Sequence, residues 1–350
     1  MVAPPLEISA RDKRNGKKCL NCRQNFKKLN LAIVILNWNG KSWLEKFLPN
    51  VIQHSAGADL FVIDNKSTDD SVEFLKNEFP HVSVVFNTEN HGFAGGYNEG
   101  LKQIKHEFYC LLNSDVEVTA NWLQPVLELF EKNEKIAAIQ PKILDFNRRE
   151  YFEFAGAAGG LIDNLGFPYC RGRIFENIEK DEGQYDDESE IFWASGCCLF
   201  IRSADFWAQN GFDERFFAHQ EEIDLCWRLK NSGRKIFYTG KSTVYHVGGG
   251  TLNKQSAQKT FLNIRNNLSM LLKNLPFPKA FWILLLRFIL DGFAGIYFGL
   301  KNGFPHFLAV IQAHFSFYAQ VPGTLKRRQK NQISQFYQAK WLVFKNFLKS

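Results

Sequence analysis

Short, unbroken runs of apolar residues recur along the first third of the chain, and each run ends in small polar residues. Such a run is typical of a strand that is buried on both faces. Between the first two runs, apolar side chains recur at helical spacing from Trp43 to Leu48. Strands that alternate with helices in this way predict a doubly wound, mostly parallel α/β sheet. The predicted strands are residues 31–36, 60–63, 82–86 and 108–112.

The pattern continues with longer gaps up to about residue 252. We expect a helix over residues 122–132, a short strand at 136–139 and a loop-rich stretch to about residue 189. A small-residue turn then leads into an apolar strand that ends at residue 201. Glu221 opens a further predicted helix.

Polar residues stand just past the ends of the buried strands. Asn37 follows the first strand, Asp64 the second, and Asn113-Ser114-Asp115 the strand at 108–112. Ligands bind in the crevice at the carboxyl ends of the strands of an open α/β sheet. Each of these segments, taken alone, is also typical of an ordinary turn. Together, at one edge of one sheet, they predict a nucleotide site in which Asp115 offers a carboxylate to a cation and a phosphate.

A glycine-rich stretch covers residues 91–100. It lacks the G-x-G-x-x-G spacing of a dinucleotide site, and Leu101 stands where a Walker A lysine is required. Its glycines permit tight turns and a close approach of backbone to a ligand. A purely structural loop explains the same residues.

The acidic stretch at Glu221, Glu222 and Asp224 has two explanations. Acids favour the first turn of a helix, and Asp224 is spaced to pair with Arg228 one turn later. The aromatic residues at 212, 216 and 217 favour a second explanation, because a carboxylate beside apolar walls has the raised pKa of a general base.

His246 precedes three glycines. A mobile loop of this composition can bring an imidazole to a metal or a diphosphate, although a single histidine is also a common packed side chain.

Composition adds three constraints. The net charge of +7 suits an anionic partner such as nucleotide phosphates or acidic lipids, and no recognition motif for nucleic acid accompanies it. The seven cysteines do not form a disulfide framework, and Cys19 and Cys22 lack the second pair of a zinc site. We expect reduced thiols in the cytoplasm, with Cys197 and Cys198 in the core. Residues 1–28 predict a flexible basic leader without the apolar segment of a signal peptide.

The last third of the chain has a different character. Residues 281–300 are long and apolar enough to span a bilayer, but Arg287 and Asp291 interrupt them at a spacing that allows the two to pair. A second aromatic segment at 304–321 and a basic cluster at 326–330 follow. We expect amphipathic helices that lie in the membrane interface. A soluble helical appendage on the catalytic domain is the alternative.

The ordered set of motifs resembles the inverting family 2 glycosyltransferases of GT-A fold, especially the rhamnosyltransferase-like branch of cell-envelope polysaccharide synthesis. Two departures stand out: Asn113 replaces the first acid of a stricter Asp-x-Asp motif, and Glu222 stands where the catalytic base is usually aspartate. The matching segments are residues 35–39, 63–69, 92–96, 112–115, 195–197, 221–228 and 245–249.

The resemblance implies roles for individual residues. Glu222 would be the catalytic base, with Glu221 as the alternative. Asp115 and His246 would bind a divalent cation, Mg²⁺ or Mn²⁺. The acceptor side would include Ser195, Gly196 and Asp224. The nucleotide-sugar would contact Asn37, Asn39, Asp64, Asn65, Gly92, Phe93, Ala94, Gly95, Asn98, Asn113 and Ser114.

The resemblance also implies the reaction and its setting. A sugar would pass with inversion from a UDP- or dTDP-sugar to a glycan or lipid-linked acceptor, on the cytoplasmic face of the membrane. The catalytic domain would cover residues 29–255, with a nucleotide half to about 118 and an acceptor half beyond it, followed by the helical region 256–350. A non-catalytic protein that keeps the fold and binds sugar nucleotides or membranes is the alternative.

Overall fold

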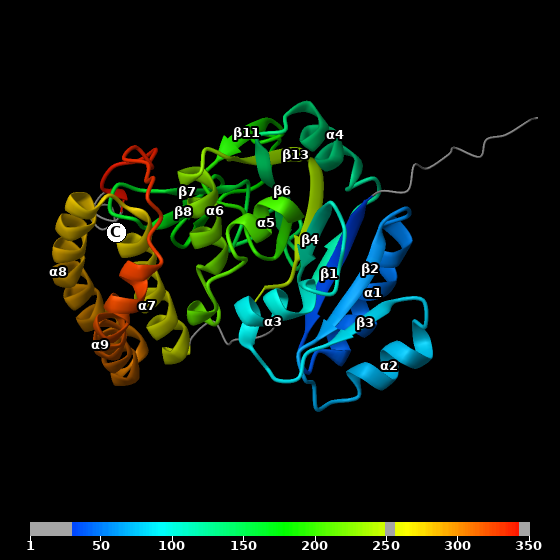
Figure 1. Ribbon diagram of the computed structural model, residues 1–350, viewed down its shortest axis with the longest axis horizontal. Coiled ribbons are helices and arrows are strands. Elements are labelled where there is room, and N and C mark those ends of the chain that lie inside the picture. The colour runs from blue at the N-terminus through cyan, green and yellow to red at the C-terminus, as the bar shows by residue number, and fades with distance from the viewer. Residues whose placement is uncertain (1–29, 249–255, 343–350) are drawn as a thin grey trace, which may run out of the picture.

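The computed structural model describes residues 30–248 and 256–342. The predicted leader at 1–28, with Cys19 and Cys22, and the glycines that follow Gly248 lie outside these residues. In Figure 1 a large twisted sheet occupies one side of the molecule and three long helices, α7, α8 and α9, the other.

A nine-stranded mixed sheet forms the centre of the fold. The strands run in the order β11-β13-β6-β12-β4-β1-β2-β3, and β5 pairs with β13. Adjacent strands in the series β4-β1-β2-β3 are parallel, and β13 is parallel to β6. Strand β12 is antiparallel to both of its neighbours, β4 and β6. The strands are β1 (Leu31–Asn37), β2 (Asp59–Asp64), β3 (Ser83–Phe86), β4 (Phe108–Leu112), β5 (Val116–Val118), β6 (Ile136–Asp145), β11 (Glu188–Ile191), β12 (Cys198–Arg202) and β13 (Lys235–His246).

Helices cover both faces of this sheet, as the continuous apolar strands predict. In β1, Leu31, Ile33 and Ile35 pack with one face and Ala32 and Val34 with the other, because side chains alternate along a strand. Helices α1 (Lys41–His54), α2 (Ser71–Glu78) and α4 (Gln124–Lys132) cover the first face. Helices α3 (Gly92–Leu101), α5 (Ser203–Ala208) and α6 (Glu221–Asn231) cover the second.

Several sequence predictions need correction. The glycine-rich stretch is the helix α3, not a loop, because Gly96 and Gly100 let the helix lie directly on Leu36 and Ile63. The strand predicted at 136–139 continues to Asp145, since β13 pairs with its whole length. The loop-rich stretch contains a small second sheet of β7 (Gly160–Ile162), β8 (Pro168–Cys170), β9 (Arg173–Ile174) and β10 (Asn177–Ile178).

The C-terminal helices are α7 (Ala257–Asn274), α8 (Phe277–Asn302) and α9 (Phe304–Lys326). Helix α7 lies between α6 and the α8–α9 hairpin: its Met270 and Leu271 join the domain core, and its Leu268 and Leu272 pack with α9. Among the described residues, α8 is the one helix long and apolar enough to cross a membrane.

Candidate active site

The carboxyl ends of β1 and β2 hold a buried pair of polar side chains. The Asn37 amide donates to Asp64 Oδ1 at 3.4 Å and to Ser67 Oγ at 3.1 Å, and Asp64 Oδ2 accepts from the Ser67 backbone at 3.1 Å. The Asn37 side-chain oxygen is buried and has no hydrogen-bond partner among the described residues. A polar atom left in that state favours a ligand at this corner.

Two neighbouring asparagines instead hold the loops in place. Asn65 donates to Asn90 Oδ1 and to the Gly92 carbonyl, and it accepts from Asn87. Asn39 has a positive φ of 51° and accepts from the backbone of Thr68. Both side chains shape the predicted nucleotide site, although their own polar atoms are bonded to the protein.

The start of α3 is occupied by another part of the chain. The amides of Phe93 and Ala94 donate to the Phe217 carbonyl at 2.9 and 3.2 Å. Gly92 has φ 68°, and a Cβ there would lie 2.6 Å from the Phe217 ring, so this position requires glycine. Gly95 faces His91 within the same helix. These first amides therefore anchor the loop before α6.

Asn98 has a structural position. Its amide group donates to the Phe212 carbonyl and to Glu214, and its oxygen accepts from the Phe212 backbone. This buried side chain joins α3 to the loop before α6. Its amide group therefore has no free N–H for the contact with the nucleotide-sugar that the sequence predicted.

Asp115 and His246 lie together because β5 pairs with the end of β13. The register places His246 opposite Val116, one residue from Asp115. His246 Nε2 is 3.2 Å from Asp115 Oδ1 and 3.4 Å from the Asn113 amide nitrogen. Ser114 lies near Gly40, at the start of α1. The two residues predicted to bind a cation are thus adjacent and buried.

Glu153 lies on the opposite side of the His246 ring from Asp115, and the sequence did not reveal it. Its Oε1 is 3.3 Å from His246 Nδ1, and its Oε2 accepts from the backbone of Ala155 and Gly156. Burial alone would lower the pKa of His246, but the Glu153 and Asp115 carboxylates on either side raise it to about 10. An acid between two phenylalanines was the signal in the sequence.

Glu222 lies at the start of α6, beside the Ser195–Gly196 turn. A Cβ on Gly196 would be 3.9 Å from the Glu222 Cβ and 3.3 Å from the Phe93 ring. Burial raises the pKa of Glu222 to about 7, while backbone amides of α6 and of Gly196 act in the opposite direction. Its Oε2 has no hydrogen-bond partner within the described chain.

Glu221 and Ser195 are more deeply buried. Burial, and then the neighbouring Glu222 carboxylate, raise the pKa of Glu221 well above its usual range. Ser195 is 2% exposed, and its backbone N–H donates to Gln140 Oε1 at 2.8 Å. Ser195 therefore holds the turn, and the buried Gly196 lies between the Phe93 ring and Glu222.

The loop that leads into α6 has an unusual backbone. Phe217, His219 and Gln220 all have φ between 62° and 71°, which non-glycine residues rarely adopt and which costs about 1–3 kcal/mol each. The Asn266 amide of α7 donates to the carbonyls of Phe216, Ala218 and His219 at 2.7–3.0 Å. A C-terminal helix thus holds the conformation that places Glu222.

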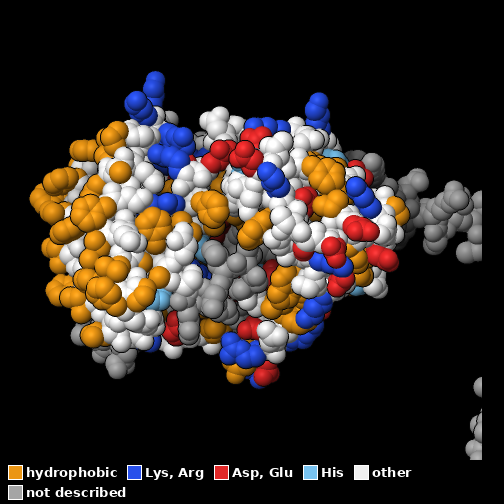
Figure 2. All heavy atoms as spheres, turned by 90° about the horizontal axis from the view of Figure 1, so that it is seen from below, with side chains coloured by type: hydrophobic (Ala, Val, Ile, Leu, Met, Phe, Trp, Pro, Cys, Tyr) orange, Lys and Arg blue, Asp and Glu red, His pale blue; other side chains and the backbone are white. Residues whose placement is uncertain are grey.

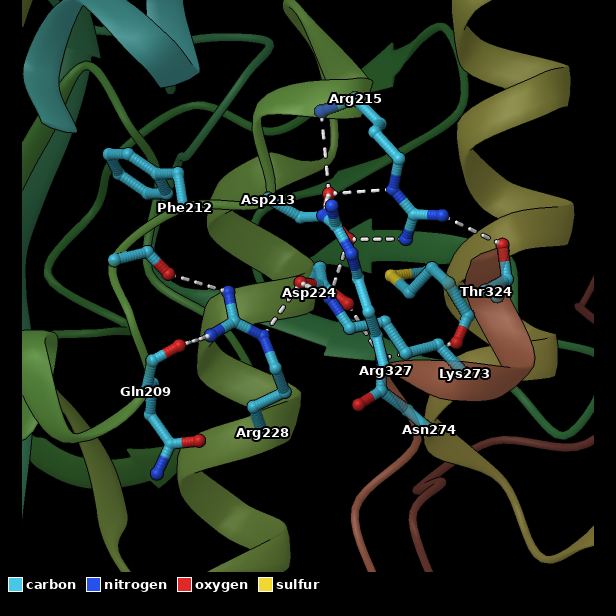
Figure 3. A network of polar contacts seen from close by, with 12 residues as sticks. Gln209, Phe212, Asp213, Arg215, Asp224, Arg228, Lys273, Asn274, Thr324 and Arg327 are labelled. Carbon is cyan, nitrogen blue, oxygen red and sulfur yellow. Dashed lines mark hydrogen bonds and ion pairs between the residues drawn. The ribbon is translucent and has the colours of Figure 1, made fainter. Parts of the chain in front are cut away.

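Asp224 belongs to a buried ion cluster, shown in Figure 3. It is fully buried and binds Arg228, as the spacing predicted, together with Lys273 and Asn274 of α7. Lys273 also binds Asp213, which in turn binds Arg215 and Arg327. Asp224, predicted on the acceptor side, thus has both carboxylate oxygens bonded to protein side chains.

The site thus has two chemically different ends. Asp115 and His246, the two residues predicted to bind a cation, lie at the carboxyl end of the sheet. Glu222 provides, across the Gly196 turn, a carboxylate whose pKa near neutrality suits proton abstraction.

Comparison with known proteins shows the family to which the chain belongs. The family model described as glycosyl transferase family 2 matches residues 32–208, half of the chain. The N-acetylglucosaminyl-diphospho-decaprenol L-rhamnosyltransferase of Mycobacterium tuberculosis is 24% identical over 232 residues, which cover 62% of this chain and 75% of that protein. Rhamnosyltransferase WbbL of Escherichia coli is 24% identical, over a stretch that covers 59% of this chain and 79% of that protein.

Solved structures show the same GT-A fold. S. aureus TarS 1–349 in complex with UDP-GlcNAc has a TM-score of 0.55 at 14% identity, with coverage of 85% of this chain and 83% of that one. GalNAc-T7 with UDP, GalNAc and Mn²⁺ has a TM-score of 0.56 at 18% identity, and the match covers 71% of this chain and 48% of that one. The fold predicted from the sequence is confirmed.

Proposed function

Because this chain belongs to glycosyl transferase family 2, we propose that it is an inverting enzyme that transfers a deoxyhexose, rhamnose in first place, from a nucleotide-diphospho-sugar. The observations that carry the proposal are the contact of Asp115 with His246 at the sheet edge and the half-buried Glu222 beside the Gly196 turn. Two rhamnosyltransferases among the relatives support the choice of sugar.

Glu222 acts as the general base. Its carboxylate takes the proton of the acceptor hydroxyl while that oxygen attacks the anomeric carbon from the side opposite the diphosphate, which inverts the configuration. The anomeric carbon–oxygen bond to the diphosphate breaks in the same step. A pKa of about 7 matches this task, because the group is both substantially ionised at neutral pH and basic enough to accept the proton.

The residues at the sheet edge fit a divalent cation, Mg²⁺ or Mn²⁺. One carboxylate and one imidazole suit Mn²⁺ somewhat better than Mg²⁺. Asp115, His246 and Glu153 form a row in which the ring separates the two acids, and no group of three such side chains arranged to hold a metal occurs in the described residues. Imidazole binds a metal only in its neutral form, so the cation would displace the ring proton that faces Asp115, and diphosphate oxygens and water would supply the other ligands. Bound there, the cation would neutralise the charge of the leaving diphosphate. Glu153 would orient the His246 ring from its other nitrogen.

The nucleoside lies at the ends of β1 and β2. Asp64 holds the ribose or base, and the unpartnered Asn37 oxygen accepts from it. We propose a UDP- or dTDP-sugar as donor, which TarS in complex with UDP-GlcNAc supports at the level of the fold. The acceptor is a glycan or a lipid-linked glycan of the cell envelope, and the reaction takes place on the cytoplasmic face of the membrane; the decaprenol-linked name of one relative supports this acceptor class.

Donor hydrolysis tests the proposal. The purified protein is incubated with UDP- and dTDP-sugars and Mn²⁺, and the release of nucleoside diphosphate is followed by mass spectrometry. Release that depends on Glu222 and on the cation supports the proposal. Tight binding of a sugar nucleotide without any release or transfer would favour the alternative, a binding protein that keeps the fold.

A further inference from the structure

Helices α8 and α9 have the reverse of the usual polarity of a helix in a water-soluble protein. The charged side chains in the middle of α8 point inward: Arg287 and Asp291 are 2% and 3% exposed, whereas the exposed Lys301 and Lys326 stand at the ends of α8 and α9. Arg287 binds Asp291 and the side-chain oxygen of Asn267 on α7, and Asp291 lies 3.2 Å from His314 on α9. The two charges that interrupt the apolar stretch are therefore neutralised inside the three-helix unit.

The outward side of the same helices is apolar and largely aromatic. Trp282 and Phe293 of α8 are each 67% exposed, and Phe315 of α9 is 71% exposed. In Figure 2 the hydrophobic side chains gather over this end of the molecule, whereas charges of both signs are mixed over the other end. We call this surface the hairpin face, and it comprises Phe277, Phe281, Trp282, Leu285, Phe288, Ile289, Phe293, Ile296, Tyr297, Leu300, Phe304, Leu308, Ile311, Phe315 and Tyr318.

The charges around the hairpin face have one sign. Residues 277–330 contain seven basic residues and a single acid; Arg287 and Asp291 pair inside the unit, and the remaining six charges are all basic. Lys326 and Lys330 are exposed where α9 ends, next to the start of α8 that carries Lys279. Aromatic side chains bordered by lysines suit the boundary between anionic headgroups and acyl chains.

Two further facts decide how deep the hairpin face can enter a membrane. Helix α8 packs on α7 and α9, and α7 is bound to the catalytic domain through its Asn266 and Lys273. Only the outer side of α8 can therefore meet lipid, because the inner side carries the bonds of Arg287 and Asp291 to its neighbours.

We propose that the hairpin face is a docking surface for an anionic lipid monolayer, into which α8 and α9 insert side by side without crossing it. This inference goes beyond the proposed transfer reaction, because it concerns a surface that contains none of the active-site residues. It identifies lipid as the occupant on the basis of the reversed polarity, the aromatic content and the basic border.

Vesicle flotation tests the docking surface. The full chain is mixed with vesicles of phosphatidylcholine alone, or of phosphatidylcholine with phosphatidylglycerol. We expect flotation with the anionic vesicles, and a fall in the partition coefficient of at least about 100-fold for the triple variant Trp282→Glu, Phe293→Glu, Phe315→Glu. Phe86→Glu, at a 51% exposed phenylalanine on the edge strand β3, is the matched control and should float as the parent does.

Three results would overturn the proposal. The first is flotation of the triple variant equal to that of the parent. The second is a stable dimer in light scattering, dissociated by the triple variant, with no flotation of either protein, because the occupant is then a second copy. The third is strongest quenching of Trp282 fluorescence by lipids brominated at the ends of their acyl chains, which would mean that α8 spans the bilayer. The Trp282 signal is taken as the difference between the parent and Trp282→Phe. We expect the strongest quenching from lipids brominated near the headgroup. None of these measurements uses donor or acceptor, so they are independent of the proposed activity.

Discussion

The Lys273 ammonium of α7 lies 2.8 Å from Asp224 Oδ2 of α6, two residues after the proposed base. Burial would raise the pKa of Asp224, but Lys273 and then Arg228 hold it below its usual range. The same ammonium binds Asp213, at the start of the loop that leads into α6 (Figure 3). One lysine from the C-terminal region therefore holds both ends of the segment that carries the catalytic machinery.

Removal of this ammonium should destabilise the protein strongly. Lys273→Met leaves two buried carboxylates without their shared partner, and the loss of one member of a buried ion pair costs about 3–5 kcal/mol. We expect a fall of that size in the free energy of unfolding by urea. Lys301→Met, at an exposed lysine of α8, is the control and should change it by less than about 0.5 kcal/mol. Equal stability of the two variants would show that the cluster is not needed.

Asn266 should act on the rate through the loop that it holds. Asn266→Ala removes the donor to three carbonyls of the strained loop, so the loop can relax and Glu222 moves away from the acceptor. We expect kcat to fall about 10- to 100-fold, with donor affinity by calorimetry within about twofold of the parent. Asn302→Ala, at an exposed position of α8, is the control. Loss of donor affinity with unchanged kcat would contradict this role.

Substitution of each of the two neighbouring glutamates can distinguish the general base from a residue that only supports it. Glu222→Gln keeps the shape but cannot accept a proton, so kcat should fall about 10²- to 10⁴-fold with donor affinity nearly unchanged. Glu221→Gln should be milder, since Glu221 is the more buried of the two. If Glu221→Gln is inactive and Glu222→Gln turns over normally, the assignment is wrong by one residue. If both turn over normally, the base lies elsewhere.

The raised pKa of Glu222 predicts opposite trends for activity and stability. The kcat/KM should rise with pH through about 7, where the base ionises in the free enzyme. The folded state binds this proton more tightly than the unfolded state, so the contribution of Glu222 to stability is present below the unfolded pKa and is lost as pH rises through about 7. Glu222→Gln should therefore have a higher Tm than the parent at pH 8 and an equal one at pH 4. A Tm difference independent of pH would argue against the shift.

The cation site can be tested without turnover. Asp115→Asn should abolish Mn²⁺-dependent binding of UDP or dTDP, measured by calorimetry, with the far-UV spectrum unchanged. Glu153→Gln should weaken metal affinity about 10- to 100-fold, because a second carboxylate orients the His246 ring. Full activity in excess EDTA would exclude a cation-dependent reaction at these residues.

The sequence predicted the sheet and most of the candidate site because both rest on local signals. Apolar runs followed by Asn37, Asp64 and Asp115 are visible within a few residues, and the acids at the start of α6 are as well. The parallel pairing of β1 with β2 and β4, and of β2 with β3, confirms the predicted mostly parallel sheet.

What the sequence did not reveal depends on contacts between distant segments. Glu153 meets His246 only because β6 and β13 pair along their length and the chain then turns back. Both amide hydrogens of Asn98 are used in hydrogen bonds to Phe212 and Glu214, more than a hundred residues away. The polar side chains of α7 likewise bond to the loop before α6, some fifty residues earlier in the chain.

The position of Asn266 and Lys273 also affects how the enzyme matures during its synthesis. Domains generally fold from the N-terminus while the chain is still being made. The sheet and the cation residues can form early, but the segment that carries Glu222 gains its buried partners only after α7 has left the ribosome, and Arg327 joins the cluster later still. A growing chain therefore assembles its central sheet before the segment that carries Glu222 is held in place, and by the time Arg327 emerges the hairpin face has already been made.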